Sequence, residues 1–469
     1  MTFDKNIKGY FIGIGGVGVN ALAKFALDYG VKVSGSDGKI NGLCNEIASK
    51  GAQIFLSDGK LSKEQMAKIA NADFVCFSSA IPYDNKELAY ARKLGKRVLE
   101  RHELLSEISH LFGKVIAIAG THGKTSTTAM AVHILKNRDV KFVGFIGGES
   151  VDFSNYVNNS GGGDIGKLKD CTFVCEACEY KRHLLSLNPD VALVGNAELD
   201  HPDSYKCMDE INETFSKFLS DASVKILSNE YAYLVDMQNC EHLKKYKWFR
   251  GQTIGEQEKS EIKCLCKNSH ALVCDEKSVR MLKLKDGGQY NYHNATFALA
   301  AAKCAGVSLE DGVSALDSYK GVKRRFEYAG TIDGAKVYFD FAHHPSEIEN
   351  AIKRASHIGK TLVVFQPHTY SRTKAYLDDF ADALCNKHGG AKCVVLMPTY
   401  AAREQKSDGV DSDELASAIF DKFCKNNVYL MKNAQSTVDF VKTHAKLYRV
   451  VLMLGAGDIY DLKEKLWDK

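Results

Sequence analysis

The fold is decided by residues 115–136, which have the sequence VIAIAGTHGKTSTTAMAVHILK. The short apolar run Val115–Ala119 predicts a buried strand, and the segment from about Ser126 to Lys136 predicts a helix. Between them lies Gly120-Thr121-His122-Gly123-Lys124-Thr125. A strand, a glycine-containing loop and a helix in this order favour a phosphate-binding loop, because the first N–H groups of such a helix point toward an anion.

The residues of this loop suit a nucleoside triphosphate. Backbone N–H groups would surround the phosphates, Lys124 would reach the β- and γ-phosphate oxygens, and the Thr125 hydroxyl would hold Mg²⁺. The loop is shorter than the common G-x-x-x-x-G-K-[ST] motif, because Ile118 stands where the first glycine would be. The predicted ATP-binding residues of the loop are Gly120, Thr121, His122, Gly123, Lys124, Thr125 and Ser126.

Acidic and histidine residues follow two further predicted strands. Glu176 comes directly after Thr172–Cys175, where nucleotide hydrolases commonly have an acidic metal ligand. Val191–Val194 continues into a polar turn at residues 195–203, which contains His201. We therefore predict a metal site formed by Thr125, Glu176 and His201. Because Mg²⁺ prefers oxygen ligands, the histidine would need a carboxylate beside it.

A second glycine loop lies near the start of the chain. Gly13-Ile14-Gly15-Gly16-Val17-Gly18 fits G-x-G-x-x-G between a predicted strand at Gly9–Ile14 and a predicted helix at Val17–Tyr29. Such a loop binds a diphosphate, and Asp37, after the next strand, could meet a ribose hydroxyl. Alone this pattern would also fit a nicotinamide dehydrogenase, but the Gly120–Thr125 loop argues against that class.

Short apolar runs alternate with helical patterns along the whole chain, which predicts parallel sheets covered by helices. The predicted fold class is α/β with three domains in series at residues 1–112, 113–318 and 319–469. The first would be Rossmann-like, the second a P-loop-type ATPase fold and the third again Rossmann-like. Residues 152–169 contain three consecutive glycines and predict a loop that crosses the surface or closes over a site.

Composition excludes several classes of protein. The 469 residues are 45% hydrophobic and have a net charge of +4, so no basic surface for nucleic acid is expected. No run of about 18 strongly apolar residues predicts a membrane span, and the uncharged run Gly9–Ala23 has too many glycines for a signal helix. The 14 cysteines predict reduced thiols in a cytoplasmic protein. Cys171, Cys175 and Cys178 lack a second pair at zinc-site spacing.

Ordered groups of residues across all three predicted domains carry a family resemblance. They are Phe11–Gly18, residues 34–37, residues 78–82, Gly120–Thr128, residues 176–180, Arg182 with His183, Asn196, Asp200 with His201, residues 324–326, Asp340 with residues 343–345, residues 366–368 and residues 455–458. In these groups the chain resembles the Mur ligases. The resemblance extends over the whole length of the chain.

The resemblance implies an ATP- and Mg²⁺-dependent amide ligase of cytoplasmic peptidoglycan precursor synthesis. The N-terminal domain would bind UDP-N-acetylmuramic acid, the central domain ATP and the C-terminal domain the amino acid. The stretch Glu176–Leu187 is most similar to members that add L-alanine. ATP would convert the sugar acid to an acyl phosphate, which the amine of L-alanine would attack. The protein would be a monomer or a dimer without nucleic-acid or membrane partners.

The resemblance also implies roles for particular residues. The catalytic residues would be Lys124, Glu176, His201 and Arg325. The further ATP-binding residues would be His293, Asn294, Arg325, Asp340 and His343. The UDP-sugar would contact Gly15, Gly16, Gly18, Asp37, Ser78, Ser79 and Asn196, and the amino acid would contact His344, His368 and Arg372. Arg325 is preferred to its neighbour Arg324 as the cation that meets the ATP phosphates. Two departures from the family pattern are Phe297, in place of an asparagine, and Phe341, in place of a tyrosine.

Three alternatives remain at this stage. A related ligase attaches a recycled wall tripeptide to the same UDP-sugar acid. A second alternative is a nucleotide-gated binding or scaffolding protein that has lost catalysis, although Lys124, Thr125, Glu176 and His201 are all present. The third is the dehydrogenase, which leaves the Gly120–Thr125 loop unexplained.

Overall fold

A computed structural model gives the fold of the chain. It describes residues 6–201, 203–228, 245–248, 262–267, 270–275, 278–285, 288–385, 391–402, 404–423 and 427–467, so Pro202 of the predicted polar turn lies outside the described residues. The chain divides into two compact units, which are described separately. The first contains residues 1–199 and 204–321, and the second contains residues 200–203 and 322–469.

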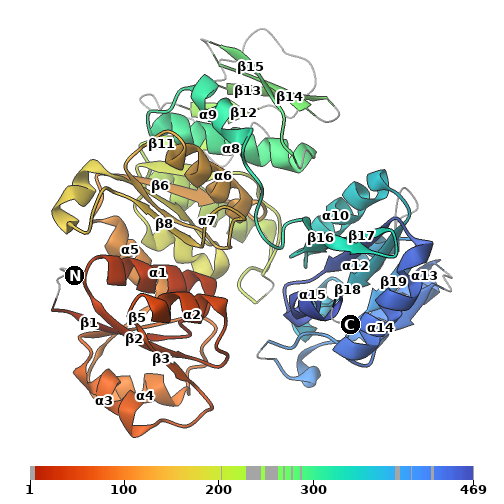
Figure 1. Cartoon of the computed structure of the whole chain (residues 1–469), viewed down its shortest axis with the longest axis horizontal. Coiled ribbons are helices and arrows are strands. Elements are labelled where there is room, and N and C mark those ends of the chain that lie inside the picture. Colours follow the sequence, from red (N-terminus) through yellow and green to blue (C-terminus); the bar gives the residue numbers. More distant parts are fainter. Residues whose placement is uncertain are drawn as a thin grey trace. The chain divides into compact units, whose positions relative to one another are not determined.

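The first unit begins with a five-stranded parallel sheet of strand order β3-β2-β1-β4-β5 (Figure 1). The β1–α1 turn confirms the predicted strand–glycine loop–helix. The elements of this region are β1 (Lys8–Ile12), α1 (Val17–Asp28), β2 (Lys32–Asp37), α2 (Gly42–Ser49), β3 (Gln53–Leu56), α3 (Lys63–Asn71), β4 (Phe74–Phe77), α4 (Lys86–Lys93), β5 (Arg97–Glu100) and α5 (Arg101–Ser109).

The rest of the first unit holds two sheets. One has seven strands in the order β12-β11-β10-β6-β9-β7-β8 and is parallel except for β8; the other is the antiparallel β13-β14-β15. The elements are β6 (Lys114–Ala119), α6 (Lys124–Lys136), β7 (Phe142–Phe145), β8 (Tyr156–Asn159), η1 (Ile165–Asp170), β9 (Thr172–Glu176), η2 (Tyr180–Ser186), β10 (Val191–Val194), α7 (Met208–Ser220), β11 (Val224–Ser228), β12 (Lys245–Trp248), β13 (Ile262–Lys267), β14 (His270–Asp275), β15 (Val279–Leu282), α8 (Gln289–Cys304) and α9 (Leu309–Leu316).

The prediction of a loop at residues 152–169 was wrong in part, because the segment contains regular structure. Residues 156–159 form β8, which pairs antiparallel with β7, and η1 begins at Ile165. Helix α1 lies against this segment: Lys24 donates to Asn155 Oδ1 and Ser154 Oγ, both at 2.8 Å, and the Tyr29 hydroxyl lies 3.0 Å from Ser160 Oγ. The strand is short and its neighbours are glycine-rich, so its contacts with α1 define it more than its own sequence pattern does.

A continuous apolar core joins the first sheet region to the seven-stranded sheet. It includes Phe25 and Phe112 from one side and Phe145 and Phe173 from the other, with Phe112 and Phe173 ring centroids 4.8 Å apart. The core explains why residues from both regions belong to one compact unit, because shared apolar burial is the main force that holds such regions together.

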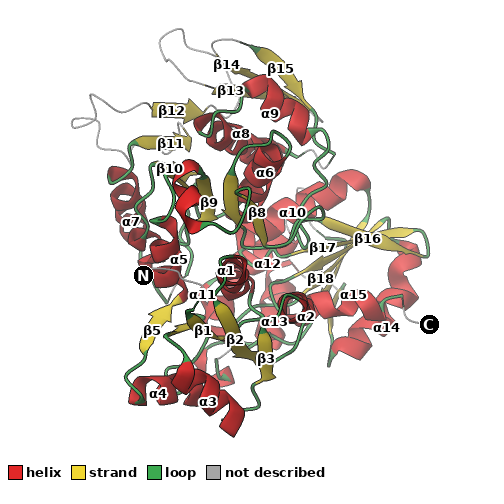
Figure 2. Ribbon diagram, turned by 60° about the vertical axis from the view of Figure 1, so that its left-hand side comes forward, coloured by secondary structure: helices red, strands yellow, loops and turns green. Residues whose placement is uncertain are grey.

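The second unit is built on a six-stranded sheet of order β16-β17-β21-β18-β19-β20, parallel except for β16. Figure 2 shows helices alongside its strands, as the alternating pattern predicts. The elements are β16 (Glu327–Ile332), β17 (Ala335–Asp340), α10 (Pro345–Ile358), β18 (Thr361–Phe365), α11 (Tyr370–Ala375), α12 (Leu377–Cys385), β19 (Cys393–Leu396), η4 (Lys406–Asp408), α13 (Ser412–Phe423), β20 (Val428–Leu430), α14 (Ala434–His444), η5 (Ala445–Leu447), β21 (Val450–Leu454), η6 (Asp458–Asp461) and α15 (Leu462–Lys465).

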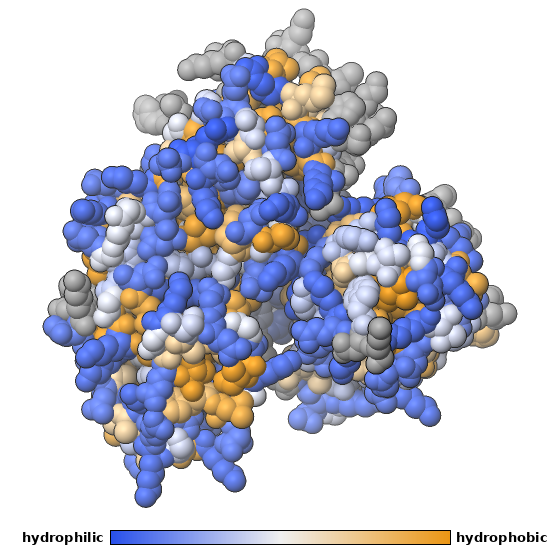
Figure 3. Space-filling model, viewed as in Figure 1, coloured by the Kyte–Doolittle hydropathy of each residue, from blue (hydrophilic) through white to orange (hydrophobic). Residues whose placement is uncertain are grey.

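Hydrophilic side chains occupy most of the molecular face shown in Figure 3, with smaller apolar areas between them. No helix in the described part of the chain has the length and apolar character needed to cross a membrane. Cys171 and Cys175 are buried thiols, and among the described residues neither belongs to a group that could hold a metal ion.

Candidate active site

The phosphate loop joins the end of β6 to the start of α6, as predicted. Gly123 has φ +81°, and a Cβ atom there would lie 2.4 Å from Asn294 Oδ1, so the loop needs glycine at this position. Helix α6 begins at Lys124, and its first N–H groups are therefore directed at the loop's concave side. Helix α8, which carries His293 and Asn294, packs against α6.

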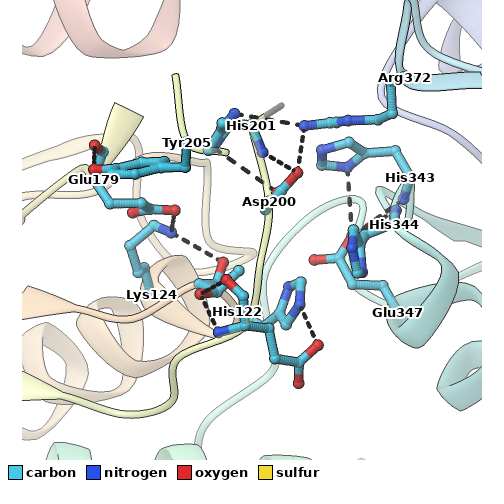
Figure 4. Close-up of polar contacts among 12 residues, drawn as sticks. His122, Lys124, Glu179, Asp200, His201, Tyr205, His343, His344, Glu347 and Arg372 are labelled. Atoms are coloured by element: carbon cyan, nitrogen blue, oxygen red, sulfur yellow. Dashed lines mark hydrogen bonds and ion pairs between the residues drawn. The ribbon is translucent and has the colours of Figure 1, made fainter. Parts of the chain in front are cut away.

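Lys124 is held inside the loop by three oxygen atoms. Its Nζ donates to Gly120 O at 2.6 Å and to Thr121 O at 3.1 Å, and it forms an ion pair with Glu179 Oε1 at 2.8 Å (Figure 4). Burial by itself would lower the pKa of Lys124, but the negative charge of Glu179 outweighs it and the pKa is raised. Lys124 is therefore a fixed positive charge at the place where phosphate oxygens would lie.

Thr125 and Glu176 come together beside Lys124. The Thr125 hydroxyl donates to Glu176 Oε2 at 3.2 Å, and the backbone N–H of Gly147 donates to Glu176 Oε1. Thr125 lies in the first turn of α6, which follows β6, and Glu176 ends β9, the strand that pairs with β6 in the sheet. A hydroxyl and a carboxylate are oxygen ligands of the kind that Mg²⁺ takes in nucleotide sites.

Asn196 braces the phosphate loop with both ends of its amide. Its Oδ1 accepts from the His122 N–H at 2.7 Å, and its Nδ2 donates to His122 O at 2.9 Å. The Thr121 hydroxyl and Glu198 backbone exchange hydrogen bonds, and His122 Nε2 lies 3.2 Å from Glu198 Oε2. The structure thus places Asn196, predicted as a UDP-sugar residue, on the backbone of the phosphate loop.

The His293 imidazole is also directed at this loop region. Its Nε2 lies 3.1 Å from Gly195 O, and its ring centroid is 4.9 Å from that of Phe297. Phe297, the departure from the family pattern, is buried and packs on the histidine. Asn294 contacts the loop at Gly123.

The second glycine loop is shaped by Asp37 from the end of β2. Asp37 Oδ2 accepts from the Gly15 N–H at 2.8 Å and Oδ1 accepts from the Lys39 N–H at 3.2 Å. Asn41 Nδ2 donates to Gly15 O at 3.0 Å, a contact that the sequence did not predict. A Cβ atom at Gly18 would lie 2.6 Å from Arg101 Cδ, so this glycine allows the arginine to approach the loop. Asp37 therefore holds the loop through its backbone.

Ser78 lies next to the same loop, as expected for strands that end at one edge of a sheet. The Ser78 N–H donates to Ile12 O at 3.2 Å, and the Ser78 hydroxyl accepts from the Ala80 N–H at 3.2 Å. An added Cβ at Gly13 would be 3.2 Å from Ser78 Cβ. Ser79 follows in the same turn after β4, and of the predicted side chains Asp37 and Ser78 both lie against the glycine loop.

Within the second unit, Arg372 and Asp200 form a buried ion pair. Arg372 Nη2 lies 2.8 Å from Asp200 Oδ1, and both side chains are less than a tenth exposed (Figure 4). Burial alone would raise the pKa of Asp200, but the charge of Arg372 holds it well below its usual range. His201 Nδ1 lies 3.5 Å from the same guanidinium nitrogen. The predicted amino-acid residue Arg372 thus has a carboxylate partner from the chain itself.

Histidines gather at the ends of β17 and β18 in this unit. His343 Nδ1 lies 3.0 Å from Phe341 O and 3.4 Å from Glu347 Oε2, and its ring faces the edge of His368 at 5.8 Å. His344 is the N-cap residue directly before α10, and its Nδ1 lies 2.9 Å from Ser346 Oγ. Burial, followed by the charge of Arg372, lowers the pKa of His343 to about 3, so it is neutral near pH 7.

Arg324 and Arg325 have different surroundings. Arg324 donates to Gly455 O at 3.2 Å and Gly457 O at 3.1 Å, whereas Arg325 has an ion pair with Glu347 at 3.9 Å and a side chain that is 29% exposed. Both guanidinium groups lie over the Phe341 ring, at 4.7 and 5.1 Å from its centroid. The phenylalanine at this departure therefore supplies an aromatic face to two cations.

The Asp340 carboxylate binds backbone N–H groups on both sides of this site. Its Oδ2 accepts from the Phe326 N–H at 2.7 Å and its Oδ1 accepts from the Ala342 N–H at 2.8 Å. Burial raises the pKa of Asp340, opposed by Arg325. The predicted ATP-side residues Arg325, Asp340 and His343 are thus neighbours in one unit, while Lys124, Thr125 and Glu176 are neighbours in the other.

Three family models match successive parts of the chain. They are described as "Mur ligase family, catalytic domain" over residues 8–112, "Mur ligase middle domain" over residues 118–302, and "Mur ligase, glutamate ligase domain" over residues 324–457. The chain belongs to the Mur ligase family. The resemblance predicted from the sequence is confirmed, and the dehydrogenase alternative is excluded.

Relatives within the Mur ligase family match along the full chain. A UDP-N-acetylmuramate–L-alanine ligase of Lachnospira eligens is 34% identical, with 99% of each chain covered, and one of Clostridium acetobutylicum is 34% identical over 100% of each. Among solved structures, a UDP-N-acetylmuramate-alanine ligase of Thermotoga maritima has a TM-score of 0.75 at 23% identity and 98% coverage of each chain. A murein peptide ligase of Psychrobacter arcticus has a TM-score of 0.71 at 22% identity, also with 98% coverage of each. The three-domain α/β fold of Mur ligases is therefore the fold of this chain.

Sequence reasoning missed Glu179 as a site residue. It lies three residues after Glu176, and its carboxylate is the partner of Lys124. A signal was present, because a second acidic residue follows the same strand and a buried lysine requires a counter-charge.

Proposed function

We propose that this Mur ligase joins L-alanine to UDP-N-acetylmuramate in an ATP- and Mg²⁺-dependent reaction of cytoplasmic peptidoglycan precursor synthesis. The observation that carries the proposal is the phosphate loop on which Lys124 pairs with Glu179 and Thr125 pairs with Glu176. The full-length similarity to UDP-N-acetylmuramate–L-alanine ligases supports these substrates.

We assign one substrate to each region of the chain. Residues 1–112, with the Gly13–Gly18 loop beside Ser78, bind the UDP-sugar through its diphosphate. Residues 113–318 bind ATP on the Gly120–Ser126 loop, and residues 319–469 bind the amino acid. The assignment is supported by the two separate glycine loops, each at the carboxyl end of a parallel strand, where ligands bind in open α/β sheets.

The donor atoms at the phosphate loop fit Mg²⁺. The Thr125 hydroxyl and the Glu176 carboxylate are oxygen ligands 3.2 Å apart, next to the place proposed for the ATP phosphates. His201, the third predicted ligand, is adjacent to the carboxylate of Asp200, as such a histidine would require. When bound there, Mg²⁺ would neutralise charge on the β- and γ-phosphate oxygens.

The reaction needs ATP because a carboxylate is a poor acceptor for an amine. An oxygen of the sugar carboxylate attacks the γ-phosphorus of ATP, and the bond between this phosphorus and the β-phosphate oxygen breaks. ADP departs, and the sugar acid now carries an acyl phosphate. The neutral amine of L-alanine then attacks the acyl carbon, and the tetrahedral intermediate expels inorganic phosphate and loses a proton to give the amide. The protein's contribution is to position three anionic substrates and stabilise the developing charge.

Lys124 and the loop N–H groups hold the phosphates during the first step. Lys124 is suited to this because Glu179 keeps it charged and the loop carbonyls fix its position. Arg325 from the second unit adds a further cation at the transferring phosphoryl group. Its partial exposure and long ion pair to Glu347 support the choice of Arg325 over Arg324.

Arg372, His344 and His368 receive the amino acid. Arg372 can bind a carboxylate with two parallel hydrogen bonds, and its present partner Asp200 occupies only one of its nitrogen atoms in the observed pair. His343 remains neutral at this site. It therefore adds no positive charge to that of Arg372, and a second charge would repel an incoming ammonium group.

The first experiment measures phosphate release from Mg²⁺-ATP with UDP-N-acetylmuramic acid, with and without L-alanine. We expect release only when both co-substrates are present, together with a UDP-sugar product heavier by one alanine residue. Release with the wall tripeptide in place of L-alanine would assign the chain to the recycling reaction. No release with either acceptor would favour a binding role.

A pair of variants on one helix controls this experiment. Lys124→Ala removes the cation at the start of α6 and should abolish phosphate release, whereas Lys136→Ala changes an exposed lysine at the end of the same helix and should not. Equal activity of wild type and Lys124→Ala would contradict the proposed role of the loop.

A further inference from the structure

Two histidines and a glutamate meet where the first sheet region contacts the seven-stranded sheet region. Glu100 ends β5, His102 lies in the first turn of α5, and His183 lies in η2. One ligand atom from each residue lies within 4.8 Å of the other two. These residues have no part in the reaction described above.

The distances among these groups suit one small cation. Glu100 Oε1 lies 3.4 Å from His183 Nε2 and 3.9 Å from His102 Nδ1. Ligands about 2.0–2.1 Å from a tetrahedral Zn²⁺ lie about 3.3–3.5 Å from one another. The two imidazole rings are stacked, parallel within 7° and with centroids 4.0 Å apart. Binding of one ion by both rings would therefore require side-chain rotations that tilt the rings toward each other.

The side chains at this position lack the hydrogen bonds that such buried groups usually make. Glu100 Oε1, His102 Nδ1 and His183 Nδ1 are buried atoms that have no hydrogen-bond partner among the residues that the structure describes. Buried polar atoms are normally satisfied. The unsatisfied Glu100 Oε1 and His102 Nδ1 lie 3.9 Å apart, and His183 Nε2 lies 3.4 Å from the same carboxylate oxygen, which places three potential ligand atoms around one point.

The backbone around the cluster is built to hold these positions. Lys181 and Arg182, directly before His183, both have positive φ, at 50° and 59°, in a region that side chains other than glycine rarely adopt. The Ser106 hydroxyl donates to Ser186 O at 2.6 Å, which ties α5 to η2. The approach of His183 to His102 is therefore fixed by contacts on both sides of the cluster.

We propose that Glu100, His102 and His183 form a zinc-binding site that links the first sheet region to the segment after β9. Two neutral imidazoles and one carboxylate are a known set of protein ligands for Zn²⁺, with a fourth position open to water. Glu100 and His102 are about one-fifth exposed, which leaves access for the ion and the water.

The charges around the cluster favour a nitrogen-binding transition metal over Mg²⁺. Arg101 and Lys181 contribute positive charge nearby. A cation must overcome this repulsion through strong bonds to imidazole nitrogen, which Zn²⁺ forms and Mg²⁺ does not.

The site would act on the geometry of the first unit. Its His183 ligand lies four residues after Glu179, the partner of Lys124, and its other two ligands belong to the region with the first glycine loop. Bound Zn²⁺ would therefore stabilise the packing of α5 against η2, since a ligand that binds only the folded state stabilises it.

The test is zinc binding by the full-length protein in excess Mg²⁺, so that the proposed magnesium site is already occupied. Wild type should bind one more equivalent of Zn²⁺ than the His102→Ala and His183→Ala variants, or bind it at least about 10–100-fold more tightly. The matched control His110→Ala changes an exposed histidine just after the same helix and should bind zinc as wild type does. Glu100→Gln, which keeps the side-chain volume, should also weaken binding.

Two further readouts separate this site from the cysteines and from misfolding. Co²⁺ in the site should show visible absorption of a tetrahedral ion without the thiolate charge-transfer bands that cysteine ligands would add, and the histidine variants should lose it. Zinc should raise the melting temperature of wild type and His110→Ala but not of the other variants, whose circular dichroism should remain native. Equal zinc stoichiometry and affinity in all of these proteins would overturn the proposal.

Discussion

The Oε1 atom of Glu179 lies 2.8 Å from the Nζ atom of Lys124, and the glutamate side chain is almost fully buried. The lysine of the phosphate loop is thus paired with a carboxylate of the chain itself. Tyr205 also holds Glu179 in place, since the Tyr205 hydroxyl donates to the backbone carbonyl oxygen of Glu179 at 2.5 Å. Glu179 is therefore a positioning residue for the cation that we assign to the ATP phosphates.

Replacement of Glu179 by glutamine should lower kcat by about 10–100-fold, the range seen when partners of a site's direct ligands are removed. Without the carboxylate, burial would lower the pKa of Lys124, so the fall in activity at alkaline pH should begin at a lower pH than in wild type. Initial-rate pH profiles measure this shift. Glu213→Gln, at an exposed position on α7, is the control. A lower kcat with an unmoved profile would mean that Glu179 does not act through Lys124.

Local patterns were sufficient to predict the strands and helices that carry the glycine loops. Val191–Val194 coincides with β10, and the helix predicted to begin at Val17 does begin there, because an apolar run followed by glycine and a helical pattern has few other folded forms. By contrast, β8 forms through contacts with β7 and α1, and a single sequence shows none of these partners.

Contacts between side chains and backbone were the part of the site that sequence could not predict. Asp37 and Asn196 were both identified as site residues, yet their amide or carboxylate groups bind the backbone of Gly15 and His122. Whether a polar residue after a strand meets a ligand or a neighbouring loop depends on the distance between two chain segments, and residue type does not report that distance.

Asn196→Ala should raise the KM for ATP by about 5- to 100-fold, because two hydrogen bonds of about 0.5–1.5 kcal/mol each to the His122 backbone are lost. The KM for the UDP-sugar should change little. Asp37→Ala should instead raise the KM for the UDP-sugar and change the KM for ATP little, since Asp37 holds the other glycine loop. Steady-state kinetics with each substrate varied in turn give both values. An Asn196→Ala variant that affects only the UDP-sugar KM would restore the role first predicted for this residue.

Arg325→Ala should lower kcat by about 10²–10³-fold, as expected for loss of a group that stabilises transition-state charge. Its melting temperature should stay close to wild type, because Arg325 is partly exposed and its ion pair is long. Arg324→Ala should instead lower the melting temperature, since Arg324 binds two backbone carbonyls and lies between two aromatic rings. If the two variants exchanged these effects, Arg324 would be the cation at the phosphates.

The buried pair of Asp200 and Arg372 should show strong coupling in a double-mutant cycle. Asp200→Asn or Arg372→Met alone should each lower the free energy of unfolding by about 3–5 kcal/mol, because each leaves one buried charge without its partner. The double variant should lose less than the sum of the two. Urea unfolding measures all four proteins, and Asp382→Asn, which disrupts the exposed pair with Lys422, should behave as wild type. Additive losses would show that the two residues do not depend on each other.

The neutral state of His343 should make its contribution to stability depend on pH. Its pKa is about 3 in the folded protein and about 6.5 in the unfolded chain, so the unfolded state binds the extra proton between these values. The contribution is fully present above about pH 6.5 and is lost as the pH falls toward about 3. Between about pH 7 and about pH 5 the loss amounts to about 2 kcal/mol, from about 1.5 pKa units.

Comparison of wild type with His343→Gln isolates this term from other titrating groups. The advantage of wild type in free energy of unfolding should shrink by about 2 kcal/mol between about pH 7 and about pH 5, because glutamine cannot take up the proton. His357→Gln, at an exposed position on the same helix α10, should follow wild type at both pH values. A constant difference between wild type and His343→Gln would mean that the pKa of His343 in the folded protein is close to its value in the unfolded chain, about 6.5.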